Sequence, residues 1–201
     1  MITTVLSVFQ KQIYGRTKPY SLNQKLGIAM VLIHYIKREL ETLFVHRFST
    51  DTMPFSNVFL NSFHYWVIFG FINMYFFLHP DYTPPKWTSD NYLWISFACF
   101  LGFEFLNLMC HITMMNLRRP GTTERGIPRG WGFDTVSCAN YLYETLCWIL
   151  FAVQSNAVGA YIFLAISFFQ MLDWALKKHK RYVEEFPNYP KNRKSMVPFI
   201  I

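Results

Sequence analysis

The feature that most constrains the fold of this chain is a long stretch without charged residues. Between Asp51 and Asp81 there is no Asp, Glu, Lys or Arg, and most of the side chains are aromatic or aliphatic. At ~1.5 Å per residue, a helix over residues 52–80 is longer than the ~30 Å hydrocarbon core of a bilayer. In lipid, a helix satisfies all of its own backbone polar groups. The stretch therefore predicts a transmembrane helix.

Three further segments have a similar apolar character. Residues 26–47 are apolar at first and then amphipathic, with apolar positions that recur at helical spacing. Residues 91–117 form a second apolar block, which follows a proline-rich loop. Residues 135–176 are long enough for two antiparallel helices that turn near residues 154–156. Each block predicts one or two spanning helices.

The N-terminal region has a different character. Residues 1–10 are apolar, lack the basic flank and cleavage site of a signal peptide, and resemble the last turns of a spanning helix. We therefore expect residues 1–25 to be the remnant of a span followed by a polar linker, and residues 26–201 to form one membrane domain. The predicted fold class is all-α, a multi-pass transmembrane helical bundle with about six spans.

Composition excludes several other classes of protein. The chain is 52% hydrophobic and only 15% charged, which is too apolar for an average soluble domain. Its net charge is +7, but the basic residues lie at the ends of the apolar blocks and form no stripe, so no nucleic-acid partner is expected. The four cysteines, Cys99, Cys110, Cys138 and Cys147, show no metal-ligand spacing. Neither a metal site nor a disulfide is predicted.

Basic residues also predict the orientation of the chain. The loop 118–132 and the tail 177–201 are rich in Lys and Arg, whereas the loop 80–90 contains Lys86 alone. Because positive loops remain in the cytosol, the loop 118–132 and the C-terminal tail are expected on the cytosolic side.

Polar residues inside the predicted helices fall on common faces. At about 100° per residue, the polar residues of the block 91–117 and of the loop that follows lie within roughly 60° of one another. The three polar stripes are Glu104, Asn107, His111 and Arg118; Asn140 and Glu144; and His34, Arg38 and Glu41 beside Tyr35. A carboxylate at mid-membrane costs roughly 2.5–3.5 kcal/mol on insertion scales, so such residues need a partner. They either join helices by hydrogen bonds or line a polar cavity open to the cytosol.

Arginines near the cytosolic ends of these stripes suggest an anionic ligand. They are Arg118, Arg119, Arg125, Arg181 and Arg193. Guanidinium groups bind phosphate oxygens in a bidentate manner, which favours a phosphorylated nucleotide or an acyl-CoA. Membrane topology alone would also place arginines here. Because the segment GIPRGWG lacks the GxGxxG spacing and a preceding strand, a nucleotide site here is not of the Rossmann type.

Four motifs resemble a known family. They are HYIKRELETLFVHRFSTDTMP (34–54), NLRRPG (116–121), SCANYLYE (137–144) and HKRYVEEFPNYPKNRKSMVPFII (179–201). Together they resemble the C-terminal catalytic domain shared by very-long-chain trans-2-enoyl-CoA reductases and steroid 5-alpha-reductases. The first motif is closer to the enoyl-CoA branch. The same holds for His111, where the steroid enzymes have an aspartate.

The resemblance implies a seven-helix membrane reductase of the endoplasmic reticulum. In this family NADPH lies in the bundle near the cytosolic face, and long-chain trans-2-enoyl-CoA is reduced in the last step of fatty acid elongation. Membrane lipid and other elongation enzymes are then the expected partners. The enoyl-CoA branch also has an N-terminal ubiquitin-like domain and an upstream helix with a functional glutamate. Since these parts are not among the 201 residues, a shortened chain is expected.

The resemblance also assigns residues to the site. The expected cofactor contacts are Asn107, Arg118, Asn140, Glu144 and Tyr182, with Arg193 supporting them. The polar stripe that begins at Glu104 adds His111, and the basic loop 118–132 adds Arg125. Tyr141 resembles the catalytic tyrosine, and Tyr35 lies at the substrate end. A tyrosine hydroxyl directed at the thioester oxygen would stabilise the enolate formed by hydride addition to the β-carbon, and could supply the α-proton.

Two other functions remain open from the sequence. One is a reductase of steroid or polyprenol enones, and the other is a non-catalytic membrane paralogue that binds elongation enzymes. Binding of NADPH would separate the two reductases from the paralogue, and the preferred substrate would separate the reductases from each other.

Overall fold

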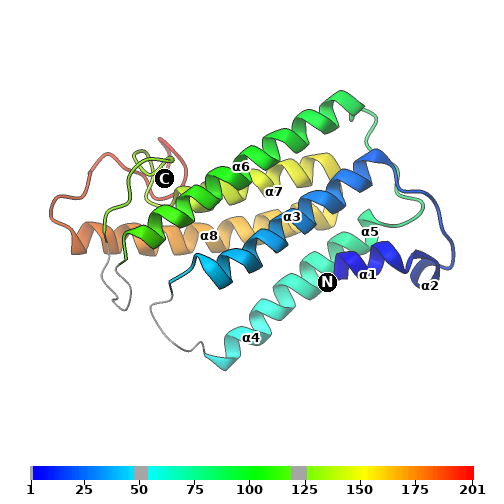
Figure 1. Ribbon diagram of the computed structural model, residues 1–201, viewed down its shortest axis with the longest axis horizontal. Coiled ribbons are helices and arrows are strands. Elements are labelled where there is room, and N and C mark those ends of the chain that lie inside the picture. Colours follow the sequence, from blue (N-terminus) through cyan, green and yellow to red (C-terminus); the bar gives the residue numbers. More distant parts are fainter. Residues whose placement is uncertain (1, 48–53, 119–125) are drawn as a thin grey trace. The chain divides into compact units, whose positions relative to one another are not determined.

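A computed structural model describes residues 2–47, 54–118 and 126–201 of the chain. Its elements are α1 (Ile2–Val8), α2 (Gln10–Tyr14), α3 (Leu22–Phe44), α4 (Phe55–Ser62), the π-helix η1 (Phe63–Met74), α5 (Tyr75–Phe77), α6 (Asp90–Asn116), α7 (Ala139–Ser155) and α8 (Val158–Glu185) (Figure 1). Within these residues the β pairing is a single isolated bridge between Val136 and Lys194. The predicted all-α class is confirmed.

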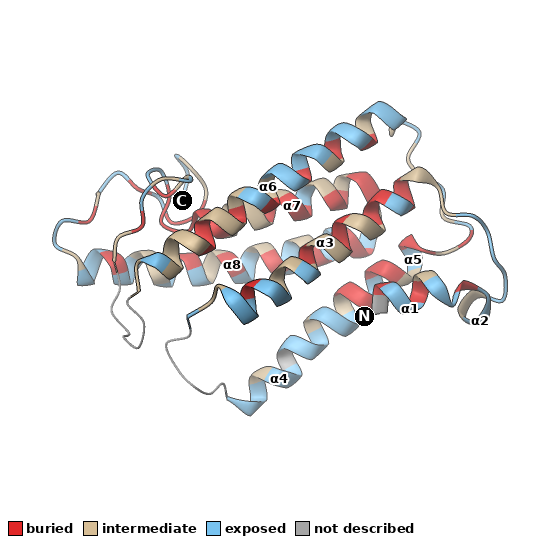
Figure 2. Cartoon of the chain, in the orientation of Figure 1, coloured by how far each residue is buried: buried red, intermediate tan, exposed pale blue. Residues whose placement is uncertain are grey.

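The uncharged stretch forms an unbroken helical run from Phe55 to Phe77, in which α4 passes into η1 and then α5. Large apolar side chains cover its outer surface, and α4 is exposed along most of its length (Figure 2). Examples are Phe55, Phe59 and Phe71. Because exposing each of these rings to water is energetically unfavourable, the surface suits a lipid environment.

Two helices, α6 and α8, are long and apolar enough to cross a membrane. Only 33% of the most apolar window of each helix is buried inside the protein. The core helix of a soluble protein would be mostly buried, so most of each apolar surface is free to face lipid. A multi-pass bundle agrees with these helices, whereas the expected number of about six spans stays a prediction.

The hairpin expected within residues 135–176 is confirmed, and its turn lies at Asn156, which adopts a left-handed backbone with φ of 45°. However, α8 continues to Glu185, well into the segment interpreted as the basic tail. Its last turns contain good helix formers and an i,i+4 pair between Lys180 and Glu184. The helix therefore ends later than its apolar part.

The chain divides into two compact units. The first contains residues 1–36, 52–101 and 148–166, and the second contains residues 37–51, 102–147 and 167–201. The first unit has an aromatic core.

Three aromatic rings form the centre of that core. Phe69, Trp148 and Phe163 meet edge to face, with ring centroids 4.7–5.3 Å apart. Beside them, Gly159 lies against the backbone of η1, so that a Cβ atom added there would come within 2.7 Å of the Ile72 carbonyl oxygen. The close approach of α8 to η1 therefore depends on this glycine.

Replacing Gly159 by alanine is expected to lower the free energy of unfolding by about 1–3 kcal/mol, because backbone atoms must move to admit the methyl group. Chemical unfolding of the detergent-solubilised chain measures the change. The control is Gly102→Ala in α6, where no atom lies within 4 Å of the added Cβ. That change should be neutral or stabilise the helix by up to about 1 kcal/mol. Equal effects at the two glycines would contradict the close packing at Gly159.

Candidate functional site

The second unit contains a cavity of about 450 Å³, a volume typical of small-molecule sites. It is formed by the residues around the end of α3, the end of α6, the start of α7 and the second half of α8. Its lining residues are Val45, His46, Arg47, His111, Met114, Met115, Leu117, Arg118, Gly126, Tyr141, Trp174, Lys177, Lys178, Arg181 and Tyr182. Five of these side chains are basic, and no acidic residue is among the described lining residues. The cavity therefore favours an anionic ligand.

Four residues expected in the site line this cavity. They are His111, Arg118, Tyr141 and Tyr182. The Arg118 guanidinium donates to the backbone carbonyl of Arg47, and the Arg47 guanidinium donates to the carbonyl of Arg118. This reciprocal pair joins the residues after α3 to the residues after α6 and brings two positive charges to one side of the cavity.

Lys37 connects the polar stripes of α3 and α6. Its ammonium group lies 2.7 Å from Glu104 and donates a hydrogen bond to the side-chain oxygen of Asn107. Asn107 in turn donates to the backbone carbonyl of Asn140 over 2.8 Å. Because Asn140 directly precedes Tyr141, this chain of contacts fixes the first turn of α7 at the cavity wall.

The Asn140 side chain is buried, and its Oδ1 atom has no hydrogen-bond partner within the described part of the chain. A buried acceptor without a partner is costly. A ligand with an N–H donor would remove this cost.

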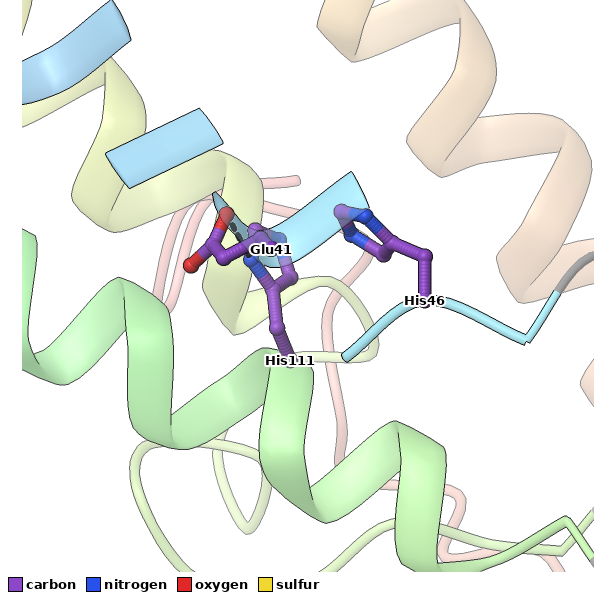
Figure 3. Close-up of side chains that lie close together, drawn as sticks. All are labelled: Glu41, His46 and His111. Atoms are coloured by element: carbon purple, nitrogen blue, oxygen red, sulfur yellow. Dashed lines mark ion pairs between the residues drawn. The ribbon is translucent and has the colours of Figure 1, made fainter. Parts of the chain in front are cut away.

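Glu41 and His111 are both buried and in contact, with Oε2 and Nδ1 3.0 Å apart (Figure 3). His46, which follows α3, lies beside them, with its ring centroid 5.1 Å from that of His111. Burial, together with the nearby charge of Arg38, lowers the pKa of His46 to about 4. The His46 ring is therefore neutral at pH 7, and the positive charge of the cavity comes from its lysines and arginines.

Glu41, His46 and His111 also have the composition of a metal site, and their ligand atoms lie within 4.8 Å of one another. The sequence predicted no such site. However, both oxygens of Glu41 already face cations, Arg38 at 3.0 Å and Lys37 at 3.5 Å. A divalent ion would have to compete with these fixed positive charges. The arrangement is better suited to holding His111 in one orientation at the cavity wall.

Arg193 is buried in the tail. Its guanidinium donates to the carbonyl of Pro128 over 2.9 Å and lies over the ring of Tyr189, 5.3 Å from its centroid. Tyr189 stacks on Tyr182, with the two rings 5.4 Å apart and nearly parallel. Ser137 reinforces this contact with a 2.6 Å hydrogen bond to the Tyr189 hydroxyl. Arg193 thus joins the tail to the loop before α7 and, through the ring of Tyr189, supports the ring of Tyr182.

Five other expected residues that the structure describes are not among those that line the cavity: Asn107, Asn140, Arg193, Tyr35 and Glu144. Tyr35 belongs to the first unit, where its ring contacts Tyr65 and Phe69. Glu144 is half-buried on α7, one turn after Asn140. Arg125 lies outside the described residues, as does Arg119. The roles of these residues in a site stay predictions.

Several lining residues were not predicted from the sequence. His46 and Arg47 follow the end of α3, where helical periodicity no longer predicts the direction of a side chain. Trp174 and Lys178 are one turn apart on α8, and Tyr182 is one turn further. Extending the helical pattern past Lys177 would have revealed this face.

Comparisons with known proteins agree on one family. Residues 51–201 match the family model described as 3-oxo-5-alpha-steroid 4-dehydrogenase. The very-long-chain enoyl-CoA reductase of Dictyostelium discoideum is 42% identical over 190 residues, covering 94% of this chain and 62% of the relative. A Caenorhabditis elegans protein named as a probable very-long-chain enoyl-CoA reductase is 45% identical over 174 residues, covering 84% of this chain and 56% of the relative.

The steroid branch is more distant. The mouse protein 3-oxo-5-alpha-steroid 4-dehydrogenase 1 is 30% identical over 181 residues, which cover 90% of this chain and 70% of that protein. The chain thus spans less than two thirds of the length of both enoyl-CoA reductases, 62% and 56%.

Proposed function

Because this chain belongs to the 3-oxo-5-alpha-steroid 4-dehydrogenase family, we propose that it is an NADPH-dependent reductase of the 2,3 double bond of long-chain trans-2-enoyl-CoA. The observation that carries the proposal is the basic cavity with the Tyr141 side chain in its wall. The choice of substrate rests on the relatives, since identity is 42–45% to proteins named as enoyl-CoA reductases and 30% to the steroid enzyme.

The residues of the cavity fit NADPH as a cofactor. Arg118, Lys178 and Arg181 offer donors to phosphate groups, and no carboxylate among the described lining residues opposes them. Asn140 precedes the lining residue Tyr141 and does not itself line the cavity, but its unpartnered Oδ1 would suit the N–H donor of a carboxamide. Bound in this cavity, NADPH would supply the hydride of the reduction. Tyr182 and Trp174 offer aromatic faces on which planar rings stack.

In this proposal, Tyr141 polarises the substrate. A hydrogen bond from its hydroxyl to the thioester oxygen would stabilise the negative charge that develops there as the β-carbon is reduced. The same hydroxyl would then deliver a proton, as a general acid, towards the α-carbon. Asn107, which accepts a hydrogen bond from Lys37, donates to the carbonyl of Asn140 in the first turn of α7, and this contact would hold the tyrosine in place. Tyr35 is proposed to act at the far end of the substrate.

The location follows from the same reasoning. The apolar helices α6 and α8 support a membrane protein. We place it in the endoplasmic reticulum, where other enzymes of fatty acid elongation are its expected partners. The basic end of the chain then faces the cytosol, from which both NADPH and CoA esters arrive.

NADPH oxidation by the purified, detergent-solubilised chain tests this function. Turnover is expected with a long-chain trans-2-enoyl-CoA and not with an enone steroid. Turnover of the enone steroid and not of the enoyl-CoA would assign the chain to the steroid branch. Binding of NADPH without turnover of either substrate would leave a cofactor-binding protein that is not a reductase by itself. Absence of binding would favour a membrane interaction protein.

Replacing Arg118 by alanine is expected to weaken NADPH binding by ~1.5–3 kcal/mol, roughly ten- to a hundredfold in the dissociation constant, because a charge-assisted hydrogen bond is lost. Titration of NADPH fluorescence measures the change. The matched control is Arg16→Ala, which removes an exposed guanidinium of the first unit that pairs with Asp81. An unchanged dissociation constant for the Arg118 variant would remove Arg118 from the site.

A further inference from the structure

The last residues of the chain form a closed turn that displays apolar side chains. The backbone N–H groups of Met196 and Val197 both donate to the carbonyl of Ile201, over 3.0 and 2.8 Å. At the tip of this turn, Phe199 is 89% exposed and Ile200 is 75% exposed. Phe199 also has a φ of 66°, a left-handed backbone that is strained for a bulky residue. In water, this turn would combine strain with exposed apolar surface.

The base of the turn is fixed to the helices. Met196 is completely buried in a cluster with Cys138, Met171 and Ala175, and Val197 packs against the same cluster. Just before it, the carbonyls of Lys194 and Ser195 accept hydrogen bonds from the backbone N–H groups of Ser137 and Cys138, which directly precede α7. The position of the tip is therefore tied to a defined level along α8.

That level is the place where the candidate span α8 changes from apolar to charged. Met171 and Ala175 lie near the end of its apolar part, and Lys177 begins a strongly basic segment. The outer surface of α8 at this level includes the exposed side chains of Phe169 and Leu176, neither of which lines the cavity. A change from apolar to basic residues along a spanning helix is typical of the boundary between the hydrocarbon core and the headgroups.

We propose that the 197–201 turn is a membrane anchor, in which Phe199 and Ile200 insert into the interfacial layer of the bilayer on the side of the basic cavity. The partner is the lipid surface, because Val197 at the base of the tip packs against the same cluster as Phe168 and Leu172 of α8, a candidate spanning helix. The exposed Lys194 nearby favours anionic headgroups at the same level. This inference rests on the membrane location proposed above.

The anchor would also have a consequence for the site. The same tail carries Arg193 and Tyr189, which support Tyr182 at the cavity wall. If the tip inserts, the tail that carries Tyr189 and Arg193 is held in two ways, by the packing of Met196 against α8 and by the insertion of Phe199 and Ile200 into lipid.

Fluorescence quenching by lipids tests the anchor in the full chain reconstituted into vesicles of phosphatidylcholine and phosphatidylserine. A bimane probe is attached to Phe199→Cys, or in a second variant to Ile200→Cys, with Cys99 replaced by serine. Cys99 is exposed, whereas Cys110, Cys138 and Cys147 are buried, so labelling is confined to the new thiol. Lipids brominated at a shallow or a deep position of the acyl chain serve as quenchers.

Two reference probes separate the possible failures. The native Cys99 on α6 reports insertion of the span itself, and Lys191→Cys, with Cys99 replaced, reports the aqueous side. Probes at 199 and 200 are expected to lose most of their fluorescence, more with the shallow than with the deep bromines, while the probe at 191 loses little. Quenching at Cys99 but not at 199 or 200 would overturn the anchor alone. No quenching at Cys99 would overturn the membrane location on which it rests.

Discussion

The Tyr141→Phe variant is expected to reduce long-chain trans-2-enoyl-CoA at least about 100-fold more slowly than the native chain, with NADPH affinity nearly unchanged. The substitution removes one hydroxyl and keeps the ring. The ring packs against the buried cluster of Cys138, Met171 and Met196, so its position in α7 should not change. Without the hydroxyl, the charge that develops on the thioester oxygen loses its hydrogen-bond donor, and the general acid is lost as well.

Steady-state kinetics and NADPH titration measure the two effects separately. The matched control is Tyr143→Phe, which removes a hydroxyl from the same helix two residues later, where the side chain is not among those lining the cavity. Its turnover should be that of the native chain. Full activity of the Tyr141 variant would transfer the acid role to another residue, and an equal loss in both variants would point to a general defect of α7.

The Lys37→Met variant is expected to be about 3–5 kcal/mol less stable than the native chain, the usual cost of leaving buried charges without their partner. Lys37 faces two carboxylates, Glu104 at 2.7 Å and Glu41 at 3.5 Å, whose side chains are 5% and 2% exposed. Methionine keeps most of the volume and removes the charge. Asn107 would also lose a donor, so the first turn of α7 should become less well fixed.

Chemical unfolding in detergent measures this loss. The control is Lys180→Met on α8, where the i,i+4 pair with Glu184 is exposed and should contribute at most about 1 kcal/mol. A double variant, Lys37→Met with Glu104→Gln, separates charge from packing, because it removes one of the stranded carboxylates. It should recover part of the lost stability. A loss at Lys37 no larger than the loss at Lys180 would contradict a buried network.

Helical periodicity is the reason why part of the candidate site could be predicted. Glu104, Asn107 and His111 follow one another along α6 at helical spacing, so a local pattern is enough to place them on one face. Tyr141 and Tyr182 came instead from the resemblance to a family, since an aromatic residue in a spanning helix has no special pattern of its own. His46 and Arg47 could not be found because they follow the end of a helix.

The sequence by itself determined the helices and their polar faces. The length of an apolar block, the prolines and glycines that end it and the 3.6-residue period are all local properties. In a bilayer they constrain the fold strongly, because backbone groups outside a helix find no hydrogen-bond partner in lipid. Only the tertiary structure decided which faces meet. Lys37 lies between Glu41, Glu104 and Asn107, and Arg193 is folded against Pro128, because segments distant in sequence pack together there. Such contacts depend on the packing of the whole unit, which no local pattern contains.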